Sequence, residues 1–255
     1  MNCKISSLHF SPIKSLSFQT LKSCLLKKNI GIKDDRIYAF SRNLNSDEAI
    51  LIEKDPSKRE LVNYLTLKNS PFLNRYNFNL ENDDISIIKD GNEITSIPKN
   101  DRESLSKKLL ELEPKLPKPI YLLKNQYYPF FDTTHSEKIS NTISLINLNS
   151  IKDFESKINK TIEFERFRAN IYVKNLEAWI ERTWIGKIIR INKIVFKVLS
   201  HIPRCSATNL KINSEISDIN ITTKLRKTYD HTDMGIYLLV LNDGKIKVGD
   251  DVKIL

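Results

Sequence analysis

The chain has 255 residues, and its 41 Lys and Arg against 31 Asp and Glu give a net charge of +10. The lysines are spread along the whole sequence, and aromatic residues are not interleaved with them as a stacking platform for bases requires. We therefore assign the charge mainly to solvated faces, with an anionic small ligand as the second interpretation and nucleic acid as a distant third. No apolar run approaches the roughly 20 residues that span a bilayer, so we expect a cytoplasmic protein with no membrane partner.

Cysteine and glycine usage excludes further classes. Only three cysteines occur, at positions 3, 24 and 205, so neither a disulfide framework nor a paired-cysteine zinc site is indicated. The six glycines form no G-x-G-x-x-G or Walker-type loop, which argues against the standard phosphate-cradle folds.

The first hundred residues predict short strands broken by Asn, Asp and Ser clusters. Examples of such runs are 37–40, 49–52 and 85–88. A capping-box pattern at Asn100 and Glu103, followed by leucines at helical spacing, then predicts a helix that Pro114 ends. Frequent turns between short strands indicate a small β-barrel or sandwich.

The proline-rich stretch 114–119 cannot continue a helix or join a central strand, so we place a domain boundary there. The predicted domains are 1–114 and 115–255. The second opens with a strand at 144–148 and a helix capped near Ser150 whose face carries Ile151, Phe154 and Ile158. The fold class expected is a β-dominated α+β protein with a few short helices.

Three further elements are predicted in the second half. A short helix is expected at 176–182, and the β-branched run 188–199 predicts a strand that leads to residues 203–208. The segments 236–241 and 245–255, joined by Asn-Asp-Gly at 242–244, predict a terminal hairpin.

Cys205 stands out because it follows that strand and lies next to Arg204. A neighbouring guanidinium lowers the cost of forming a thiolate, which is the form of cysteine that attacks substrates and binds metals. From residues 203–208 alone, Cys205 would more commonly be a small buried hydrophobic residue, as most free cysteines are. A thiol hydrolase would need a base, but His201 lies about 13 Å away in an extended chain and nothing in the sequence brings His231 close.

Several separated segments, taken in order, resemble the MOSC family, named for the C-terminal domain of molybdenum cofactor sulfurase. In the first half they are Pro-Ile-Lys-Ser at 12–15 and Gly-Ile-Lys-Asp-Asp-Arg at 31–36, which resemble the β-barrel domain preceding MOSC in the amidoxime-reducing branch. The segments of the second half are 166–171, Glu181 with Trp184, 203–205, 235–237 and 248–250. The resemblance implies an N-terminal β-barrel packed on a MOSC β-barrel, with the molybdenum cofactor bound between them.

The resemblance also implies a ligand set. Cys205 would bind molybdenum, which suits a soft thiolate, and would be the catalytic residue. Lys14 and Arg36 would hold the cofactor's phosphate as a point charge and a bidentate fork. The remaining implied cofactor contacts are Ser15, Arg166, Arg168, Asn170, Arg204 and Thr208.

These contacts have simpler alternatives. Lys14 and Arg36 could be ordinary surface charges, and Arg166 and Arg168 could pair with Glu163 and Glu165 on a solvated strand. If the stretch from Arg166 to Asn170 is extended, the three side chains share one face and could meet a flat ligand. Because the family motifs occur together and in order, we favour contact with the cofactor over the simpler alternatives.

Two positions need separate mention. Ala169 stands where the family usually has proline, which makes this stretch less rigid. Asp132 falls where relatives have an acidic residue near the pocket rim, and a plain turn aspartate is an equal alternative.

The resemblance implies an activity, the reduction of N-hydroxylated or N-oxide small molecules. This chain shows no cysteine spacing for an iron–sulfur cluster. The electrons would therefore come from a separate carrier of the ferredoxin, flavoprotein or cytochrome b5 type. One alternative is a persulfide carrier on Cys205, charged by a partner desulfurase because this chain shows no pyridoxal phosphate domain. Another is a non-catalytic cofactor-binding module or a basic β-barrel that touches nucleic acid.

Overall fold

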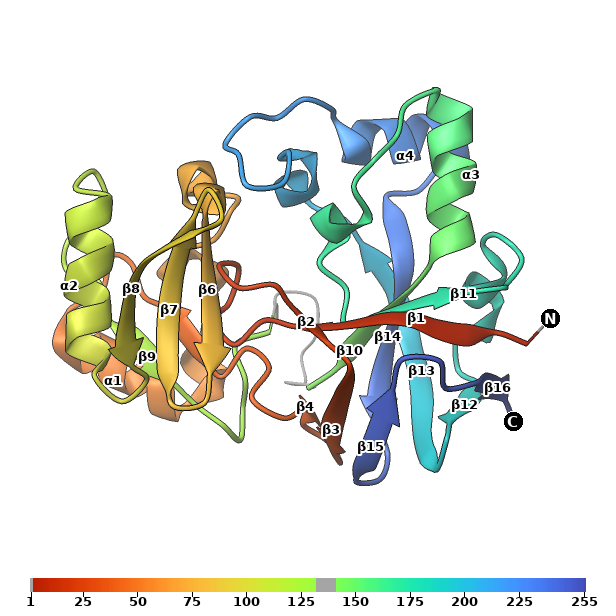
Figure 1. Ribbon diagram of the computed structural model, residues 1–255, viewed down its shortest axis with the longest axis horizontal. Helices are drawn as coiled ribbons and strands as arrows, with labels where there is room; N and C mark the ends of the chain where they lie inside the picture. Colours follow the sequence, from red (N-terminus) through yellow and green to blue (C-terminus); the bar gives the residue numbers. More distant parts are fainter. Residues whose placement is uncertain (1, 132–140) are drawn as a thin grey trace. The chain divides into compact units, whose positions relative to one another are not determined.

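The computed structural model describes residues 2–131 and 141–255 (Figure 1). The chain forms two compact units, each built from separate stretches. Unit 1 comprises Met1–Phe10, Gln19–Lys33 and Asn141–Leu255, and unit 2 comprises Ser11–Phe18 and Asp34–Ser140. The predicted domain boundary at 114/115 stays a prediction. The division into compact units differs from it, because Met1–Phe10 and Gln19–Lys33 group with the C-terminal half of the chain.

Unit 1 contains an eight-stranded sheet with the strand order β16-β12-β13-β14-β10-β11-β1-β2. Its neighbours are antiparallel except β10 and β11, which run parallel. The bounds are β1 Lys4–Phe10, β2 Gln19–Leu21, β10 Ile143–Asn147, β11 Ile171–Lys174, β12 Ile188–Ile191, β13 Ile194–Pro203, β14 Asp233–Val240 and β16 Val252–Ile254.

Alternation along these strands builds the core of unit 1. In β13, Ile194, Phe196 and Val198 are buried while Lys197 between them is exposed. Successive side chains of a strand point to opposite faces, so this pattern turns one face of the sheet to the core. Ile189 and Leu238, on the strands beside β13, lie in the same apolar cluster.

Strands outnumber helices in the described residues, as expected. The sheets there are open, so the predicted closed barrels are not found. The start of β1 nevertheless meets the turn before β16: the Ile5 amide donates to the Asp250 carbonyl (2.9 Å) and the Val252 amide to the Cys3 carbonyl (2.9 Å). These contacts, with an isolated bridge between Lys4 and Asp251, join the two ends without forming a continuous ladder between β1 and β16.

A second sheet of unit 1 has the order β15-β3-β4. Its strands are β3 Ser23–Lys27, β4 Gly31–Ile32 and β15 Gly244–Lys247. The predicted terminal hairpin is therefore wrong, because β15 pairs with β3 and not with β14. Both edges of β14 are already taken by β10 and β13, and the Asn242 side chain accepts a hydrogen bond from the Val195 amide (2.8 Å), which holds the turn against β13.

The two α-helices of unit 1 begin at side-chain caps. The Asn147 side chain accepts from the Asn149 amide at the start of α3, and the Asn220 side chain caps α4. The cap thus lies three residues before the predicted Ser150, but the expected face of Ile151 and Phe154 is buried. The bounds are α3 Leu148–Ile158, α4 Ile221–Tyr229, and the 3-10 helices η4 Phe164–Phe167, η5 Ile180–Trp184 and η6 Ser206–Asn209.

Unit 2 combines a three-stranded meander, a two-stranded ladder and two α-helices. Figure 1 shows α2 beside the meander β6-β7-β8. The strands are β5 Tyr38–Phe40, β6 Tyr76–Glu81, β7 Asp84–Lys89, β8 Asn92–Pro98 and β9 Leu122–Lys124. The helices are α1 Ser46–Lys54, α2 Arg102–Leu112, and the 3-10 helices η1 Pro56–Lys58, η2 Leu61–Asn63 and η3 Pro71–Arg75.

Two of the sequence predictions in unit 2 need correction. The run 49–52, expected as a strand, lies in α1 because Asn45 and Glu48 form a capping box that starts a helix. The helix expected after Asn100 is confirmed as α2, but its cap is Asp101, whose side chain accepts from the Ser104 amide. Leu105 and Leu109 are buried on its inner face.

Candidate functional site

Cys205 lies at the exposed end of the longest strand of unit 1, β13, where the chain turns into η6. It occupies the cap position of η6 without a hydrogen bond from its side chain. The Cys205 carbonyl accepts the Thr208 amide (3.1 Å) and the Thr208 hydroxyl (2.9 Å). The backbone of Cys205 is thereby fixed, and its thiol is left accessible.

Arg204 holds the turn that carries this cysteine. Its Nε donates to the Met234 carbonyl (2.9 Å), to which Nη2 also donates, and its Nη1 donates to the Phe167 carbonyl (3.0 Å). Burial lowers the pKa of the Arg204 guanidinium, while Cys205 is among the neighbours that oppose this shift. Arg204 therefore ties β14 and the end of η4 to the cysteine turn and lies within electrostatic reach of the thiol.

Arg166 is buried in ion pairs within the unit. Its guanidinium donates to Glu163 (2.6 Å from Nε), to Asp218 (2.5 Å from Nη1) and to the Asn209 carbonyl (3.3 Å). The hydrogen bond from Arg166 lowers the pKa of Asp218 to about 2. Pairing with Glu163 was the simpler alternative for this residue, and the Asn209 contact joins η4 to η6.

The stretch from Arg166 to Asn170 is not extended, so the prediction that three side chains share one strand face is wrong. Residues 164–167 form η4, and Arg168 closes it in the left-handed region with φ +51°. The Ala169 amide then donates to the Tyr172 hydroxyl (3.1 Å), which itself donates to the Phe164 carbonyl (2.8 Å). These bonds stabilise the turn before β11.

Asn170 lies buried between two strands of the large sheet. Its Oδ1 accepts from the Ser144 amide (3.1 Å) and hydroxyl (3.0 Å), and its Nδ2 donates to the His9 carbonyl (3.2 Å). The Asn170 amide group thus joins β10 to β1, a structural role that sequence reasoning did not anticipate.

The acidic and imidazole groups of unit 1 are similarly engaged. Glu181 is fully buried, its pKa is raised by that burial, and it accepts from Ser150 Oγ (2.7 Å) and Asn147 Nδ2 (3.1 Å). His201 Nε2 contacts the Arg182 carbonyl (3.2 Å), and His231 Nδ1 accepts from the Asp233 amide (3.2 Å). Nothing in these contacts supplies Cys205 with a base.

The three predicted residues of unit 2 lie close together within that unit. Lys14 is buried, and its ammonium donates to the Phe130 carbonyl (3.1 Å). The Arg36 carbonyl accepts the Phe130 amide (2.7 Å), and its guanidinium lies 5.0 Å from the centre of the Phe131 ring. Ser15, beside Lys14, takes the left-handed conformation at φ +66°. Asp132 lies outside the described residues.

Arg36 also forms an ion pair with Asp35, which is buried and accepts the Ser11 amide (2.6 Å). The chain 11–18 is thereby fixed to the turn that ends at Arg36. Lys14, Arg36 and the left-handed turn at Ser15 thus lie together in unit 2, and their contact with an anion stays a prediction. Sequence reasoning missed Phe130 and Phe131, whose only signal was two aromatic residues after a proline.

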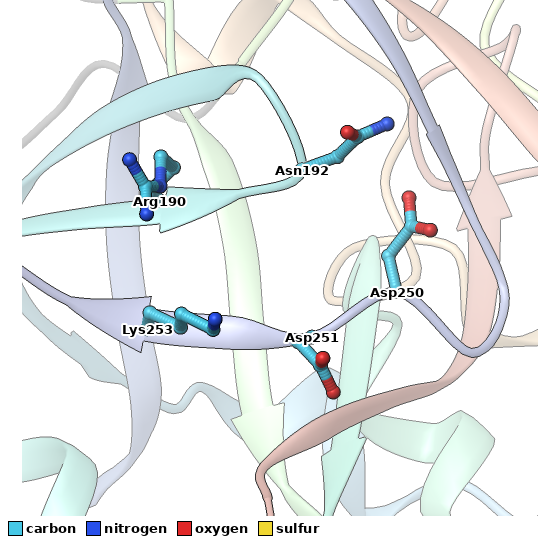
Figure 2. A pocket seen from close by; sticks show the side chains of 5 residues that line it. All are labelled: Arg190, Asn192, Asp250, Asp251 and Lys253. Carbon is cyan, nitrogen blue, oxygen red and sulfur yellow. The ribbon is translucent and has the colours of Figure 1, made fainter.

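A shallow depression of about 260 Å³ lies elsewhere on unit 1 and contains none of the predicted residues. Figure 2 shows Arg190 and Lys253 on neighbouring strands, and the two lie opposite each other in the β12–β16 register. Asn192, Asp250 and Asp251 complete the lining. Both signs of charge are present, and Asp251 pairs with Lys4 (2.8 Å), so we do not assign this depression to the candidate site.

Residues 132–253 match the model of the MOSC domain. The chain contains a MOSC domain. Every predicted site residue of unit 1, from Arg166 to Thr208, lies within this match. The molybdenum ligand set itself stays a prediction.

Curated relatives point to one branch of that family. The chain is 30% identical over 122 residues to mitochondrial amidoxime reducing component 2 of Rattus norvegicus, covering 43% of this chain and 36% of that protein. It is 28% identical over 118 residues to mitochondrial amidoxime-reducing component 1 of Danio rerio, with the same shares covered. The match therefore spans little more than a third of these relatives, and the kinship is distant.

Among solved structures, the YUAD protein of Bacillus subtilis is similar over 100% of this chain and 96% of its own, at 11% identity and a TM-score of 0.46. In the described residues, no helix is long and apolar enough to cross a membrane.

Proposed function

We propose that this protein binds the molybdenum cofactor and reduces N-hydroxylated or N-oxide small molecules with electrons from a separate carrier. The observation that carries the proposal is Cys205, exposed at the end of β13 in a turn held by Arg204 and Thr208. The MOSC match and the amidoxime-reducing relatives support the reaction class.

The donor set around Cys205 fits a soft metal centre. A thiolate is the protein ligand that such metals prefer, and the Cys205 thiol is exposed at the end of its strand. The cofactor, when bound, supplies oxygen-atom removal coupled to electron transfer. Cys205 would hold the metal. The phosphate contacts expected for Lys14 and Arg36, and the cofactor contact expected for Ser15, stay predictions.

The protein's own contribution is positioning and charge. Thr208 and Arg204 fix the backbone on either side of Cys205, which holds in place the turn that carries the thiol. Arg166 and Asn170 act further back, since their side chains hold η4, η6 and β10. We propose direct cofactor contact for Arg168 and leave Arg166 and Asn170 in supporting roles, with their predicted cofactor contacts untested.

The deciding experiment is the molybdenum and pterin content of the protein produced in a host that makes the cofactor. We expect near-stoichiometric metal in the wild type and a loss in Cys205→Ala. The matched control is Cys3→Ala: burial raises the pKa of the Cys3 thiol to about 12, so it is protonated at neutral pH and the variant should keep its metal. Absence of metal and pterin from the wild type would contradict the proposal.

A sulfur carrier is the second candidate, because an exposed thiol without a capping hydrogen bond can also accept sulfur from a partner desulfurase. The same purified samples distinguish the two. Persulfide found on Cys205 by mass spectrometry, in protein free of molybdenum, would favour the carrier over the reductase.

A further inference from the structure

Residues 128–131, here called the aromatic segment, contact both Lys14 and Arg36 in unit 2. The Phe130 carbonyl accepts the Lys14 ammonium (3.1 Å), and the Phe130 amide donates to the Arg36 carbonyl (2.7 Å). The Phe131 ring lies under the Arg36 guanidinium, 5.0 Å from its carbon to the ring centre. The orientation of Lys14 and Arg36 therefore depends on where this segment lies.

Arg59 holds the aromatic segment. Its Nη1 donates to the Tyr128 carbonyl (2.6 Å) and the Pro129 carbonyl (3.3 Å), and its guanidinium carbon lies 4.1 Å from the centre of the Phe130 ring. The other end of the fork is anchored on α1, where Nε donates to the Ile52 carbonyl (2.9 Å) and Nη2 to the Glu53 carbonyl (3.3 Å).

The chemistry of Arg59 suits a positioning role. The residue is only 9% exposed, and its hydrogen bonds within the described chain all go to backbone carbonyls. A planar fork that bonds several carbonyls and stacks on a ring cannot be replaced by the single ammonium of lysine. The Tyr64 ring is a second link between the aromatic segment and Lys14. Its centre lies 5.6 Å from that of the Phe130 ring and 5.9 Å from the Lys14 ammonium nitrogen.

We infer that Arg59 is a positioning residue that sets the orientation of Lys14 and Arg36 for an anionic group by clamping the aromatic segment to α1. The inference rests on the proposed function for the identity of that anion as the cofactor's phosphate. Loss of the clamp should free the Phe130 carbonyl from Lys14 and expose its ammonium.

The test compares Arg59→Lys with the wild type. The first readout is the rate at which an acetylating reagent modifies Lys14, measured by peptide mass spectrometry and referenced to Lys124. We expect acetylation of Lys14 to rise several-fold while Lys124 is unchanged. The second readout is the pterin content of the same protein from a cofactor-producing host, which we expect to fall.

Arg75→Lys is the matched control, because Arg75 also donates to a backbone carbonyl of unit 2, that of Phe72 (3.1 Å), and to the Glu113 carboxylate that follows α2. It should leave Lys14 acetylation at the wild-type rate. If Arg59→Lys does not fold, Phe130→Leu removes the stacked ring, keeps the carbonyls and should give a smaller rise.

The outcomes separate this inference from the proposed function. An unchanged rate at Lys14 in folded Arg59→Lys overturns the inference, whatever the pterin content. A raised rate with no pterin in the wild type supports the clamp and contradicts the proposed function. A raised rate with reduced pterin supports both.

Discussion

At the scale of single residues, the cysteine turn shows how a reactive group can be fixed without engaging its reactive atom. The hydrogen bonds of Thr208 and Arg204 go to backbone carbonyls, those of Cys205, Met234 and Phe167. The thiol keeps its accessibility while the chain around it loses freedom. Preorganised ligands of this kind are what a metal site needs from its surroundings.

Thr208→Val should test that arrangement. The change keeps the shape of the side chain but removes the hydroxyl donor to the Cys205 carbonyl. Because Thr208 is buried, we expect the free energy of unfolding to fall by about 1 kcal/mol, a typical net value for one hydrogen bond. Urea denaturation measures this. Thr208→Ser, which retains the donor, should lose less, and equal losses in both variants would contradict the role of the hydroxyl.

Ala169→Pro should destabilise the protein, although the resemblance places proline at this position in the family. Proline would remove the amide that donates to the Tyr172 hydroxyl. It would also disfavour the conformation of Arg168, which has ψ +39°, because a residue before proline prefers extended values.

We expect Ala169→Pro to cost about 2 kcal/mol, from the lost hydrogen bond and the strain together. Thermal unfolding beside the wild type, which keeps the amide, gives the comparison. Stability of Ala169→Pro equal to that of the wild type would show that the turn at 168 adapts to proline.

At the scale of elements, close contacts between neighbouring strands limit which residues are tolerated. Gly235 lies in β14, where an added Cβ would be 2.5 Å from the Leu145 carbonyl oxygen and 2.6 Å from Ile146 Cγ1. Gly249 has a similar φ, +92° against +88°, but no atom lies within 4 Å of its Cβ position. Comparing substitutions at Gly235 and Gly249 therefore distinguishes the cost of crowding at the added Cβ from the cost of the positive φ.

Gly235→Ala should therefore cost far more than Gly249→Ala. We expect a loss of about 1 kcal/mol for Gly249→Ala from the positive φ alone. For Gly235→Ala we expect about 2 kcal/mol more, since the added methyl group overpacks the contact between the paired strands β10 and β14. Chemical denaturation of both variants provides the measurement. Similar losses would mean that β10 and β14 can separate enough to admit the methyl group.

Elements with strong local signals were predictable from the sequence. The leucines at 105 and 109 and the buried run in β13 obey simple periodicities, and both elements are confirmed. The strand expected at 49–52 failed because one capping box outweighed β-branched composition. The terminal hairpin failed because β14 is paired on both edges by strands distant in sequence, a fact that no local pattern contains.

At the scale of the whole molecule, the sequence could single out candidate residues but not the contacts that they make within the fold. Family motifs led to Cys205 and Lys14, and the structure places each at a fixed turn of its unit. The supporting contacts of Arg166 and Asn170 could not be foreseen, because their partners Asp218 and Ser144 lie far along the chain. Arg59 was missed for the same reason.

His9 should make the stability of the protein depend on pH. Burial lowers the pKa of this imidazole to about 4, among the rings of Tyr172 and Phe164. The unfolded chain, with a pKa near 6.5, binds the proton more readily, so stability is full above pH 6.5 and falls as the pH drops toward 4. The loss should approach about 3 kcal/mol. Urea denaturation between pH 7 and 4 measures it, and His9→Gln, which does not titrate, should flatten that part of the profile. An equally steep fall in His9→Gln would assign the acid sensitivity to carboxylates instead.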